Sequence, residues 1–597
     1  MRSLSLKQRI VLALPVALMW ASAAGCGARR AVAVRLSSDV RRPKRSVVIF
    51  FADGLDRARL NNMLDAGMLP NISQYFVKGG VEVEHAIASM PSITYPNSVS
   101  LITGVFPGHH GILGNRWFDR SSLKYQDYAR AATYRNVNEE FTSTTLYEIL
   151  NDTLTVNVQC HTRRGVSYTI DNWAMTGINL FFGGFLEIDR RVGRRLSEVV
   201  DVANRLGRWP TALMLYFPGV DMTGHSYGAA SEAYQDAVRN LDTQIGDVIR
   251  SLHEAGIDKS TYFVLLSDHG QVVYGPGNVF DLVKWLRQRH GLRILEERVE
   301  FEHNPDAFDL LHRFDAAVVN GVYRRVVIHL KGPLGWASPA RQADILRIVE
   351  GSTPEEDHSQ ELPARPDKST LYAQPGVGLV CVRDGPNRVK VFSRAGSCVV
   401  ERRIERAKPV ADVAPASNRR EQGSRQYRLV HFPADASKNT ATADPLGYLK
   451  STPLAAFVAQ GWHDSRAWLA ATAPTDFPDF VPQVLEMFDS HRAGDIVVFA
   501  EDGWTFSDEE PSGHGSCSAS DMRVPLYVAG PGLPAGGRID HARLVDVMPT
   551  VLDLLGESGR LNEIDPIDGV SVAAELKAAP PRPTPADAKA VQTPDKN

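Results

Sequence analysis

Short, continuous runs of apolar residues recur along the chain and alternate with segments of helical periodicity. The runs at residues 47–52, 211–217 and 262–266 contain no charged side chain. Runs of this kind are typical of strands that are buried on both faces of a parallel sheet. Residues 231–256 repeat apolar side chains at helical spacing and end at a glycine, which is a stop signal for a helix. The pattern predicts an α/β fold built on a doubly wound, mostly parallel sheet.

The alternation of strand and helix patterns stops near residue 275. The segment that follows holds several strand-like runs, among them AAVVNGVYRRVVIHL, GLVCVRD, RVKVFS and YRLVHF, separated by polar stretches that contain proline. We interpret residues 276–492 as a large mixed α+β insertion with its own sheet. The apolar run at 495–500 is expected to return to the central sheet, so that the main α/β domain comprises residues 46–275 and 493–578. Residues 579–597 have the composition of a disordered tail.

The first 25 residues have the pattern of a signal peptide. A positively charged start is followed by an apolar stretch at 10–20 and by the small residues 21–25, which lead into Cys26. Small residues before a cysteine resemble a bacterial lipoprotein signal, in which that cysteine carries the lipid. We therefore expect residues 26–45 to be a tether, and the protein to be exported to the periplasm or cell envelope with a membrane-bound lipid at Cys26. A plain secretory signal and an uncleaved anchor are the alternatives.

Charge and cysteine content narrow the class of protein. Lys and Arg number 66 against 69 for Asp and Glu, so the net charge is −3 and nothing indicates a nucleic-acid polymer as partner. Five cysteines in 597 residues are too few for a fold held together by disulfides. Cys381 and Cys398 lie in strand-like runs and could pair in an oxidising compartment, a question that the sequence leaves open.

Carboxylates and imidazoles follow the ends of the predicted strands. They are Asp53 after the first run, Asp221 and His225 in a glycine-containing loop after the second, Asp268 and His269 after the third, and His514 in a glycine-rich loop further on. The carboxyl ends of parallel strands meet at one edge of a sheet, where α/β folds place their sites. Each residue taken alone has an ordinary structural explanation, because aspartate caps helices and histidine satisfies carbonyl groups.

A hydroxyl residue lies between the first and second runs. Thr94 is followed by Tyr95-Pro96-Asn97 and a short apolar-periodic segment, and proline suits the first turn of a helix. Thr94 would then lie at a helix N-terminus, where free N–H groups and the helix dipole favour an anion. For this motif taken alone, an ordinary capping threonine is the alternative.

Together these residues provide three carboxylates, three imidazoles and one nucleophilic hydroxyl. This mixture of oxygen and nitrogen donors suits divalent metals, above all zinc. Two metals about 3.5–4 Å apart can bind both the attacking and the leaving oxygen of a phosphoryl displacement. Threonine is a weak nucleophile until its hydroxyl is activated. We therefore expect two divalent metal ions, with zinc as the leading candidate.

At these residues the chain resembles the alkaline phosphatase superfamily and, within it, the type I phosphodiesterase/nucleotide pyrophosphatase family. The matching pieces, in the family's order, are FFADG, SITYPN, FPGHHGILGN, PGVDMTGHSYG, LLSDHGQ, GHGS and LVDVMPTVLDLLG. The resemblance covers about residues 46–275 and 493–557 and implies an alkaline-phosphatase-like fold. The implied ligands of one metal are Asp53, Thr94, Asp268 and His269, and those of the other are Asp221, His225 and His514. Thr94 would be the nucleophile, and Asn115 would donate to a phosphoryl oxygen.

The resemblance implies hydrolysis of a phosphodiester or pyrophosphate-type bond in a small phosphate ester, through a phospho-threonine intermediate. Ile93 and Tyr95 stand where animal nucleotide-hydrolysing members carry Lys and Phe, so nucleotide specificity does not follow. Arg163 and Arg164 lie where some threonine-using phosphomonoesterases hold the terminal phosphate, and Arg164 is a candidate substrate-binding residue. A solvated basic pair is the alternative for these arginines. The competing functions are a phosphomonoesterase and a non-catalytic, metal-containing surface binding protein.

Overall fold

The computed structural model describes residues 44–582 apart from several internal segments. The segments outside the description are 131–132, 172–175, 178, 180–181, 297–310, 321–322, 352–369, 407–422, 432–442 and 508–509. The expected signal peptide, the lipid at Cys26 and most of the expected tether and tail lie outside the described residues. Within the described residues, no helix is long and apolar enough to cross a membrane.

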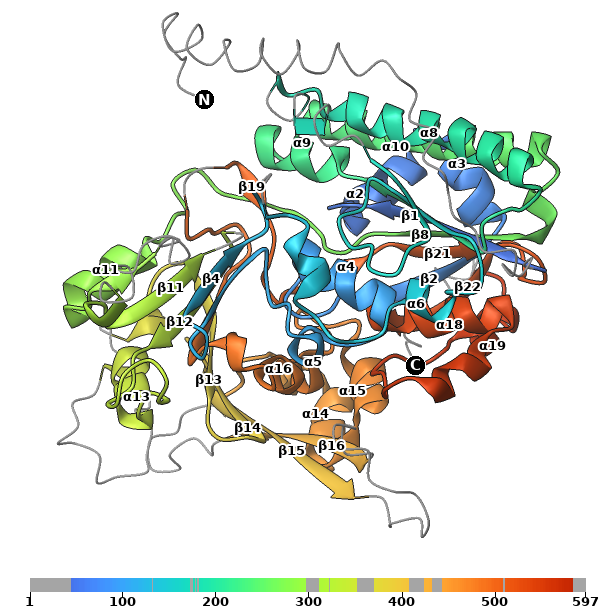
Figure 1. Ribbon diagram of the computed structural model, residues 1–597. Coiled ribbons are helices and arrows are strands. Elements are labelled where there is room, and N and C mark those ends of the chain that lie inside the picture. The colour runs from blue at the N-terminus through green and yellow to red at the C-terminus, as the bar shows by residue number, and fades with distance from the viewer. Residues whose placement is uncertain are drawn as a thin grey trace, which may run out of the picture. The chain divides into compact units, whose positions relative to one another are not determined.

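The main α/β part of the molecule is built on a nine-stranded sheet (Figure 1). The strand order is β20-β2-β21-β8-β1-β7-β5-β6, and β22 also pairs with β2. The strands are β1 (Ser46–Ala52), β2 (Val81–Ile87), β5 (Thr155–Val158), β6 (Tyr168–Ile170), β7 (Ala212–Phe217), β8 (Thr261–Leu266), β20 (Arg523–Val524), β21 (Leu526–Ala529) and β22 (Gly537–Arg543). Among the described strands of this sheet, only β20 and β21 run antiparallel to their neighbours. The predicted mostly parallel sheet is confirmed.

Helices cover both faces of this sheet, as a doubly wound fold requires (Figure 1). One face carries α2 (Arg57–Asp65), α3 (Pro70–Ile72), α8 (Phe185–Leu206) and α10 (Glu232–Glu254), and the other carries α4 (Thr94–Thr103), α6 (Leu146–Ile149), α18 (Val547–Leu555) and α19 (Ala573–Lys577). Alternate residues of β1 face opposite sides. Ile49 and Phe51 belong to the apolar cluster that includes Val551 of α18, whereas Phe50 packs edge-on against Phe76 with ring centroids 6.0 Å apart. Burial on both faces explains why this run contains no charged residue.

The insertion forms a second nine-stranded sheet, which is mostly antiparallel (Figure 1). Its order is β10-β11-β12-β18-β13-β14-β15-β16-β17. The strands are β10 (Ile294–Leu295), β11 (Ala316–Asn320), β12 (Arg325–Leu330), β13 (Val377–Arg383), β14 (Arg388–Ser393), β15 (Gly396–Arg406), β16 (Gly423–His431), β17 (His463–Asp464) and β18 (Ile496–Ala500). The accompanying helices are α11 (Leu282–His290), α13 (Gln342–Glu350), α14 (Thr452–Ala459), α15 (Ser465–Thr472) and α16 (Phe480–Phe488). The expected mixed α+β insertion is present.

One strand joins a different sheet from the one that the sequence predicts. The run at 495–500 was expected in the central sheet, but β18 lies in the second sheet between β12 and β13 and is antiparallel to both. An apolar run shows that a strand is buried on both faces, but it does not show which sheet the strand joins. The second sheet therefore extends past residue 492 of the chain.

The four described cysteines, Cys160, Cys381, Cys398 and Cys517, are buried and unpaired. Cys381 on β13 and Cys398 on β15 both lie opposite Val391 of the intervening strand β14. Strands two positions apart in a sheet are separated by about 9–10 Å, which exceeds the reach of a disulfide. The pairing that the sequence left open is therefore not formed.

Candidate active site

The predicted site residues converge from several elements of the central sheet. Asp53 and Asp268 follow the carboxyl ends of the neighbouring strands β1 and β8, and α9 (Gly219–Tyr227) follows β7 directly. Thr94 is the first residue of α4. His514 follows the short strand β19 (Ser512–Gly513), which pairs with β9 (Val272–Val273) beyond β8. The ends of adjacent parallel strands thus bring together residues that are far apart in the sequence.

Asp53, Asp268 and His269 form one group together with the hydroxyl of Thr94. The Nε2 atom of His269 lies 3.2 Å from Asp53 Oδ1, 3.5 Å from Asp268 Oδ2 and 3.2 Å from Thr94 Oγ1. All four side chains are buried, and Thr94 is 6% exposed. Because Thr94 lies within α4 and its hydroxyl contacts His269, it is not the capping residue that its motif alone would suggest.

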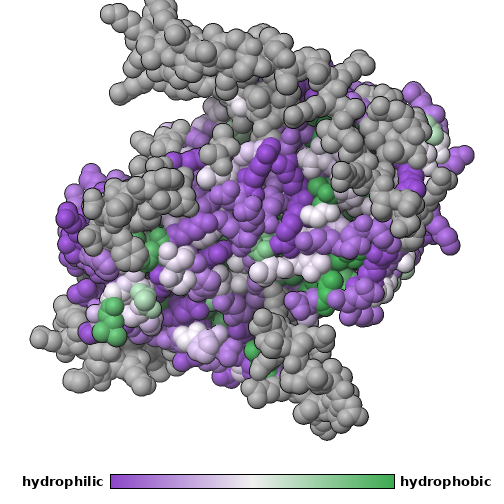
Figure 2. Space-filling model, viewed as in Figure 1, coloured by the Kyte–Doolittle hydropathy of each residue, from purple (hydrophilic) through white to green (hydrophobic). Residues whose placement is uncertain are grey.

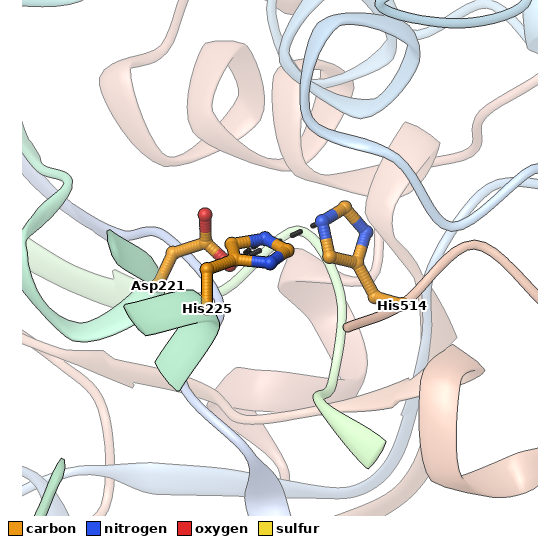
Figure 3. Close-up of side chains that lie close together, drawn as sticks. All are labelled: Asp221, His225 and His514. Carbon is orange, nitrogen blue, oxygen red and sulfur yellow. Dashed lines mark ion pairs between the residues drawn. The ribbon is translucent and has the colours of Figure 1, made fainter. Parts of the chain in front are cut away.

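Asp221, His225 and His514 form the second group (Figure 3). Asp221 and His225 lie one turn apart on α9, and His514 approaches them from a separate segment. Asp221 Oδ1 lies 3.3 Å from His225 Nε2 and 4.0 Å from His514 Nε2. The rings of His514 and His269 stack with centroids 3.4 Å apart. This stacking makes the two groups immediate neighbours.

The segment that carries Asp221 and His225 is helical, although its glycines predict a loop. A Cβ atom at Gly219 would lie 2.4 Å from Asp189 Oδ2, and one at Gly224 would lie 1.7 Å from Gln271 Oε1. The two glycines therefore permit close packing rather than irregular backbone. The helix sets the two ligand candidates at a fixed i, i+4 spacing on one face.

All three imidazoles are held through Nδ1, so that Nε2 faces the site. His514 and His269 donate from Nδ1 to backbone carbonyl oxygens at 3.0 and 2.9 Å, and His225 binds the carboxylate of Glu510 through Nδ1. A carbonyl oxygen can only accept, so Nδ1 of His514 and of His269 carries a proton, and Nε2 is the ring atom left to face a cation. This is the arrangement in which outer hydrogen bonds orient histidines toward a metal.

Buried oxygen atoms without partners indicate where a cation would bind. Within the described part of the chain, Asp53 Oδ1 and Asp268 Oδ2 are buried and accept no hydrogen bond. Burial and the charge of Asp53 raise the pKa of Asp268 well above its usual value, while burial and the two other imidazoles lower the pKa of His514, which is therefore neutral. Unsatisfied carboxylate oxygens and a neutral imidazole suit a divalent ion. In each group the carboxylate and imidazole atoms lie within 4.8 Å of one another, so the residues fit one metal per group.

Asn115 lies beside the Thr94 backbone. Its Oδ1 accepts a hydrogen bond from the N–H of Tyr95 at 3.2 Å. Asn97 holds the preceding loop, because its side chain accepts from the N–H of Ser89 at 2.7 Å and donates to three backbone carbonyls of the same loop. The backbone that presents Thr94 is thereby fixed on both sides.

The two arginines noted in the sequence have structural contacts. The Arg164 guanidinium binds Glu148 at 2.9 Å and also donates to the carbonyl oxygens of Phe141 and Ser143. Arg163 pairs with Asp171. The two arginines are therefore held within the fold, which neither the substrate-binding role nor the solvated basic pair predicts.

Three residues that support the site were not identified from the sequence. Tyr216 of β7 donates its hydroxyl hydrogen to Asp53, and Gln271 donates to Asp221 Oδ1 at 3.1 Å. Glu510 binds the Nδ1 atom of His225. Tyr216 stands in an apolar run of the sequence, where its pattern is the same as that of a residue that only packs in the core. Gln271 follows Asp268 by three positions, and this closeness to the motif is the one signal that could have found it.

The mostly parallel sheet, with carboxylates, imidazoles and a hydroxyl at the strand ends, is an alkaline-phosphatase-like fold. A family model described as type I phosphodiesterase / nucleotide pyrophosphatase matches residues 47–369, more than half of the chain. The chain therefore belongs to the type I phosphodiesterase/nucleotide pyrophosphatase family, as its motifs predict.

Similar proteins are found among curated sequences and solved structures. An uncharacterized pyrophosphatase/phosphodiesterase of Schizosaccharomyces pombe is 29% identical over 234 residues, which cover 38% of this chain and 44% of that protein. The bis(5'-adenosyl)-triphosphatase ENPP4 of Pongo abelii is 26% identical over 246 residues, which cover 40% and 50% respectively. The chain thus spans about half the length of these relatives. The structure of murine ectonucleotide pyrophosphatase/phosphodiesterase 5 matches with a TM-score of 0.50 at 13% identity, and the match covers 90% of this chain and 99% of the murine chain. This similarity is one of fold.

Proposed function

We propose that this protein is a phosphodiesterase that uses two divalent metal ions, with zinc as the leading candidate, and forms a phospho-threonine at Thr94. The observation that carries the proposal is the buried Thr94 hydroxyl, 3.2 Å from His269 Nε2 and beside two carboxylates with unsatisfied oxygens. One relative named as a pyrophosphatase/phosphodiesterase and one named as a bis(5'-adenosyl)-triphosphatase support this class of reaction. So does the murine structural relative, which has also been solved as an inactive threonine-to-alanine variant in complex with AMP. A pure binding protein would have no use for a hydroxyl in this position.

The reaction has two steps. Thr94 Oγ1 forms a bond to phosphorus as the bond to one ester oxygen breaks, and that oxygen leaves as an alcohol with the proton that the threonine gives up. Water then cleaves the bond between phosphorus and Thr94, which releases a phosphate monoester and restores the hydroxyl. Metal ions held by the two groups would neutralise phosphate charge and lower the pKa of the hydroxyl. The N-terminus of α4 favours the anion, and Asn115 would donate to a non-bridging oxygen.

The substrate in this proposal is a small phosphate ester, with diesters preferred over monoesters. A monoester carries one more negative charge, and Arg164, the candidate for neutralising it, is engaged with Glu148. Tyr95 is buried between Tyr128 and His161, with ring centroids 4.8 and 4.1 Å away, and serves as a packing residue. A selective loss of monoester hydrolysis in Arg164→Ala, with diester hydrolysis unchanged, would show that Arg164 reaches the phosphate and would favour the phosphomonoesterase alternative.

The test of the nucleophile is Thr94→Ala, assayed on matched aryl phosphate mono- and diesters. We expect kcat/KM for the diester to fall by about 10³-fold or more, because the covalent step is lost. Thr94→Ser should restore part of the rate, and Asn115→Ala should cost about 10²–10³-fold, as for the loss of one oxyanion donor. Activity near the wild-type level in Thr94→Ala would overturn the proposal.

The metal content can be tested separately from activity. Purified protein should contain close to two equivalents of zinc, one for each group of ligand candidates, and His514→Ala should lose most of one equivalent. Removing one of three protein ligands weakens a site more than changing an outer hydrogen bond, which typically costs about 10–100-fold in affinity. Full activity in a strong chelator, with no bound metal, would contradict the two-metal model.

We also propose that the mature protein begins at a lipidated Cys26 and is held at the cell envelope. The support is the run of small residues that leads into Cys26 after an apolar stretch. Mass spectrometry of the N-terminal peptide from the membrane fraction tests this. An unmodified N-terminus at another residue would indicate simple secretion.

A further inference from the structure

The helix that carries Asp221 and His225 has no capping side chain of its own. α9 begins at Gly219, and the residue before it is Pro218, whose side chain cannot accept a hydrogen bond. The first N–H groups of a helix have no partner within the helix, so its N-terminus needs an acceptor from elsewhere. With nine residues and two glycines, α9 is also short and has a low intrinsic helix propensity. Its position therefore depends on contacts with other elements.

A buried aspartate of another helix supplies this acceptor. Asp189 lies on α8, and its Oδ1 accepts a hydrogen bond from the N–H of Gly219 at 3.0 Å. Hydrophilic side chains make up most of the coloured surface in Figure 2, whereas Asp189 is fully buried. Asp189 therefore does for α9 what an N-cap residue does for its own helix.

The contact between Asp189 and α9 leaves no room for a side chain at Gly219. A Cβ atom there would lie 2.4 Å from Asp189 Oδ2, 2.7 Å from Cγ and 2.9 Å from Oδ1. Glycine at this position lets the carboxyl group lie directly against the first turn of α9. Asp221 belongs to the same turn. Asp189 is thus in contact with the part of the helix that presents a ligand candidate.

The burial of Asp189 has a cost that its hydrogen bond to Gly219 does not remove. Within the described part of the chain, Oδ2 accepts no hydrogen bond, and burial raises the pKa of the carboxyl group to about 8. A buried polar atom without a partner destabilises a fold, and an apolar side chain of similar size would avoid this cost. The carboxyl group therefore requires an explanation beyond the packing of the core.

We propose that Asp189 is a positioning residue for the second group of ligand candidates. By holding the first turn of α9, it sets how closely Asp221 and His225 approach His514, which belongs to a separate segment. The inference rests on the proposed function, since it concerns one of the two metal sites of the proposed phosphodiesterase. The first group has no member on α9, so Asp189 should affect the two sites unequally.

The test measures the affinity of the purified full-length protein for each of two zinc equivalents, by competition with a chelator. His514→Ala removes a ligand candidate of the second group and so identifies the equivalent that belongs to it. We expect Asp189→Ala to weaken this equivalent about 10–100-fold, the range for outer contacts of metal ligands, and to leave the other equivalent unchanged. Asp189→Asn keeps an acceptor oxygen for the N–H of Gly219 and should restore most of the affinity.

Gly219→Ala tests the same contact from the side of α9. Its methyl group should displace the Asp189 carboxyl group and weaken the second equivalent, even though alanine has a higher helix propensity than glycine. In the Asp189→Ala background this clash is absent, so Gly219→Ala should have little further effect there. Additive effects of the two changes would show that they act independently and would contradict the proposal. Because Gly219→Ala retains the aspartate, it also decides the question if Asp189→Ala does not fold.

Asp242→Ala is the matched control for the loss of a buried capping carboxyl group. Asp242 lies on α10, is 2% exposed and accepts a hydrogen bond from the N–H of Ile72 in α3 at 2.7 Å. Since α3 carries no ligand candidate, Asp242→Ala should lower the midpoint of thermal unfolding and leave both zinc affinities unchanged. Equal weakening of zinc binding in Asp189→Ala and Asp242→Ala would show that lost stability is the cause, and would overturn the positioning role.

The outcomes separate this proposal from the proposed function. If Asp189→Ala and Gly219→Ala both bind two zinc equivalents with wild-type affinity, the positioning role is wrong and the two-metal phosphodiesterase is unaffected. If the wild-type protein binds no zinc and hydrolyses no aryl phosphodiester, the proposed function fails and the positioning role fails with it.

Discussion

At the scale of single residues, the site depends on close backbone packing as well as on its ligand candidates. Gly54 follows Asp53 with a φ of 61°, and a Cβ atom there would lie 2.6 Å from Asp221 Oδ1. The N–H of Gly54 also donates to Asp268 Oδ1 at 3.3 Å. This one glycine therefore contacts carboxylates of both groups, and any side chain would displace one of them.

Gly54→Ala should accordingly damage metal binding as well as stability. The left-handed backbone alone costs about 1–2 kcal/mol for a residue with a Cβ, and the contact with Asp221 adds to this cost. We expect the purified variant to contain less than one equivalent of zinc. The matched control is Gly67→Ala, because Gly67 has a φ of 70° and no atom within 4 Å of its Cβ position. In thermal unfolding, Gly67→Ala should be destabilised only by the cost of the left-handed backbone, and it should retain its zinc. Equal zinc loss in both variants would show that the contact with Asp221 is not the cause.

Residues at the ends of apolar runs could be predicted from the sequence, whereas their supporting partners could not. Asp53, Asp268 and His269 follow strand patterns directly, so their convergence was predictable from the expected sheet alone. Glu510 lies 285 residues from its partner His225. A contact over that separation is set by the packing of the whole chain and leaves no local pattern.

At the scale of elements, a buried charged cluster joins the main domain to the insertion. It consists of His109, Glu486, Asp489, Asp568, Arg402 and Arg425. His109 lies in the last turn of α5 (Pro107–His110). Its Nε2 lies 2.7 Å from Glu486 of α16, and its Nδ1 lies 2.7 Å from Asp568. The arginines of β15 and β16 approach the carboxylates at 2.7–3.3 Å. Because these cations already neutralise the carboxylates, the cluster is an ion-pair network and not a third metal site.

The cluster should make stability depend on pH in a defined window. Burial raises the pKa of Glu486, but the charges of His109, Arg425 and Arg402 outweigh it and hold the pKa at about 2. Burial lowers the pKa of His109, but Asp568 and Glu486 outweigh it and raise the pKa well above its usual value. The Glu486 contribution is therefore present above its unfolded pKa of about 4.3 and lost as pH falls toward 2, and the His109 contribution is present below about 6.5 and lost as pH rises through the raised pKa.

His109→Gln should therefore destabilise the protein most between about pH 4.5 and 6.5. We expect a loss of about 3–5 kcal/mol in the free energy of unfolding, as for breaking a buried ion pair, and a smaller difference from the wild type in alkaline solution. Urea denaturation across pH measures this. His253→Gln is the control, because His253 pairs with Asp258 at the surface and its side chain is 72% exposed. A pH-independent difference for His109→Gln would show that its role is packing alone.

Element types were predictable where one local signal dominated. The strands of the central sheet carry long apolar runs, and the helix at 232–254 has a regular apolar stripe, so both were expected and both form. The helix α9 was missed because Gly219 and Gly224 lower its intrinsic propensity, while contacts with Asp189 and Gln271 decide the outcome. Tertiary packing overrides local preference at this point in the chain.

At the scale of the whole molecule, the insertion is part of the support of the site. Tyr323 forms a backbone bridge with His514. Next to it, the fully buried Arg324 binds Asp521 at 3.0 Å, and the carbonyl of Asp521 accepts the N–H of Gly270, which follows His269. The segment that leads into β12 of the second sheet therefore contacts segments that carry two of the three imidazoles. The sequence predicted two sheets but could not predict this contact, just as it could not assign β18, because apolar runs do not specify the partner of a strand.

Arg324 provides the means to measure this support. Arg324→Met removes the guanidinium and leaves Asp521 buried without its main partner, so we expect a loss of about 3–5 kcal/mol in the free energy of unfolding. Because Tyr323 and Asp521 hold the His514 and His269 segments, zinc affinity should fall as well, by about 10–100-fold, as for other outer contacts of metal ligands. The double variant Arg324→Met/Asp521→Leu should recover part of the stability, since it removes the unpaired charge, but not the zinc affinity.

Arg293→Met is the control for this prediction, because Arg293 pairs with Asp315 and its side chain is 62% exposed. Such surface pairs contribute about 0–1 kcal/mol to the free energy of unfolding. If Arg324→Met destabilises the protein while zinc titration gives the wild-type affinity, the insertion stabilises the fold without organising the site.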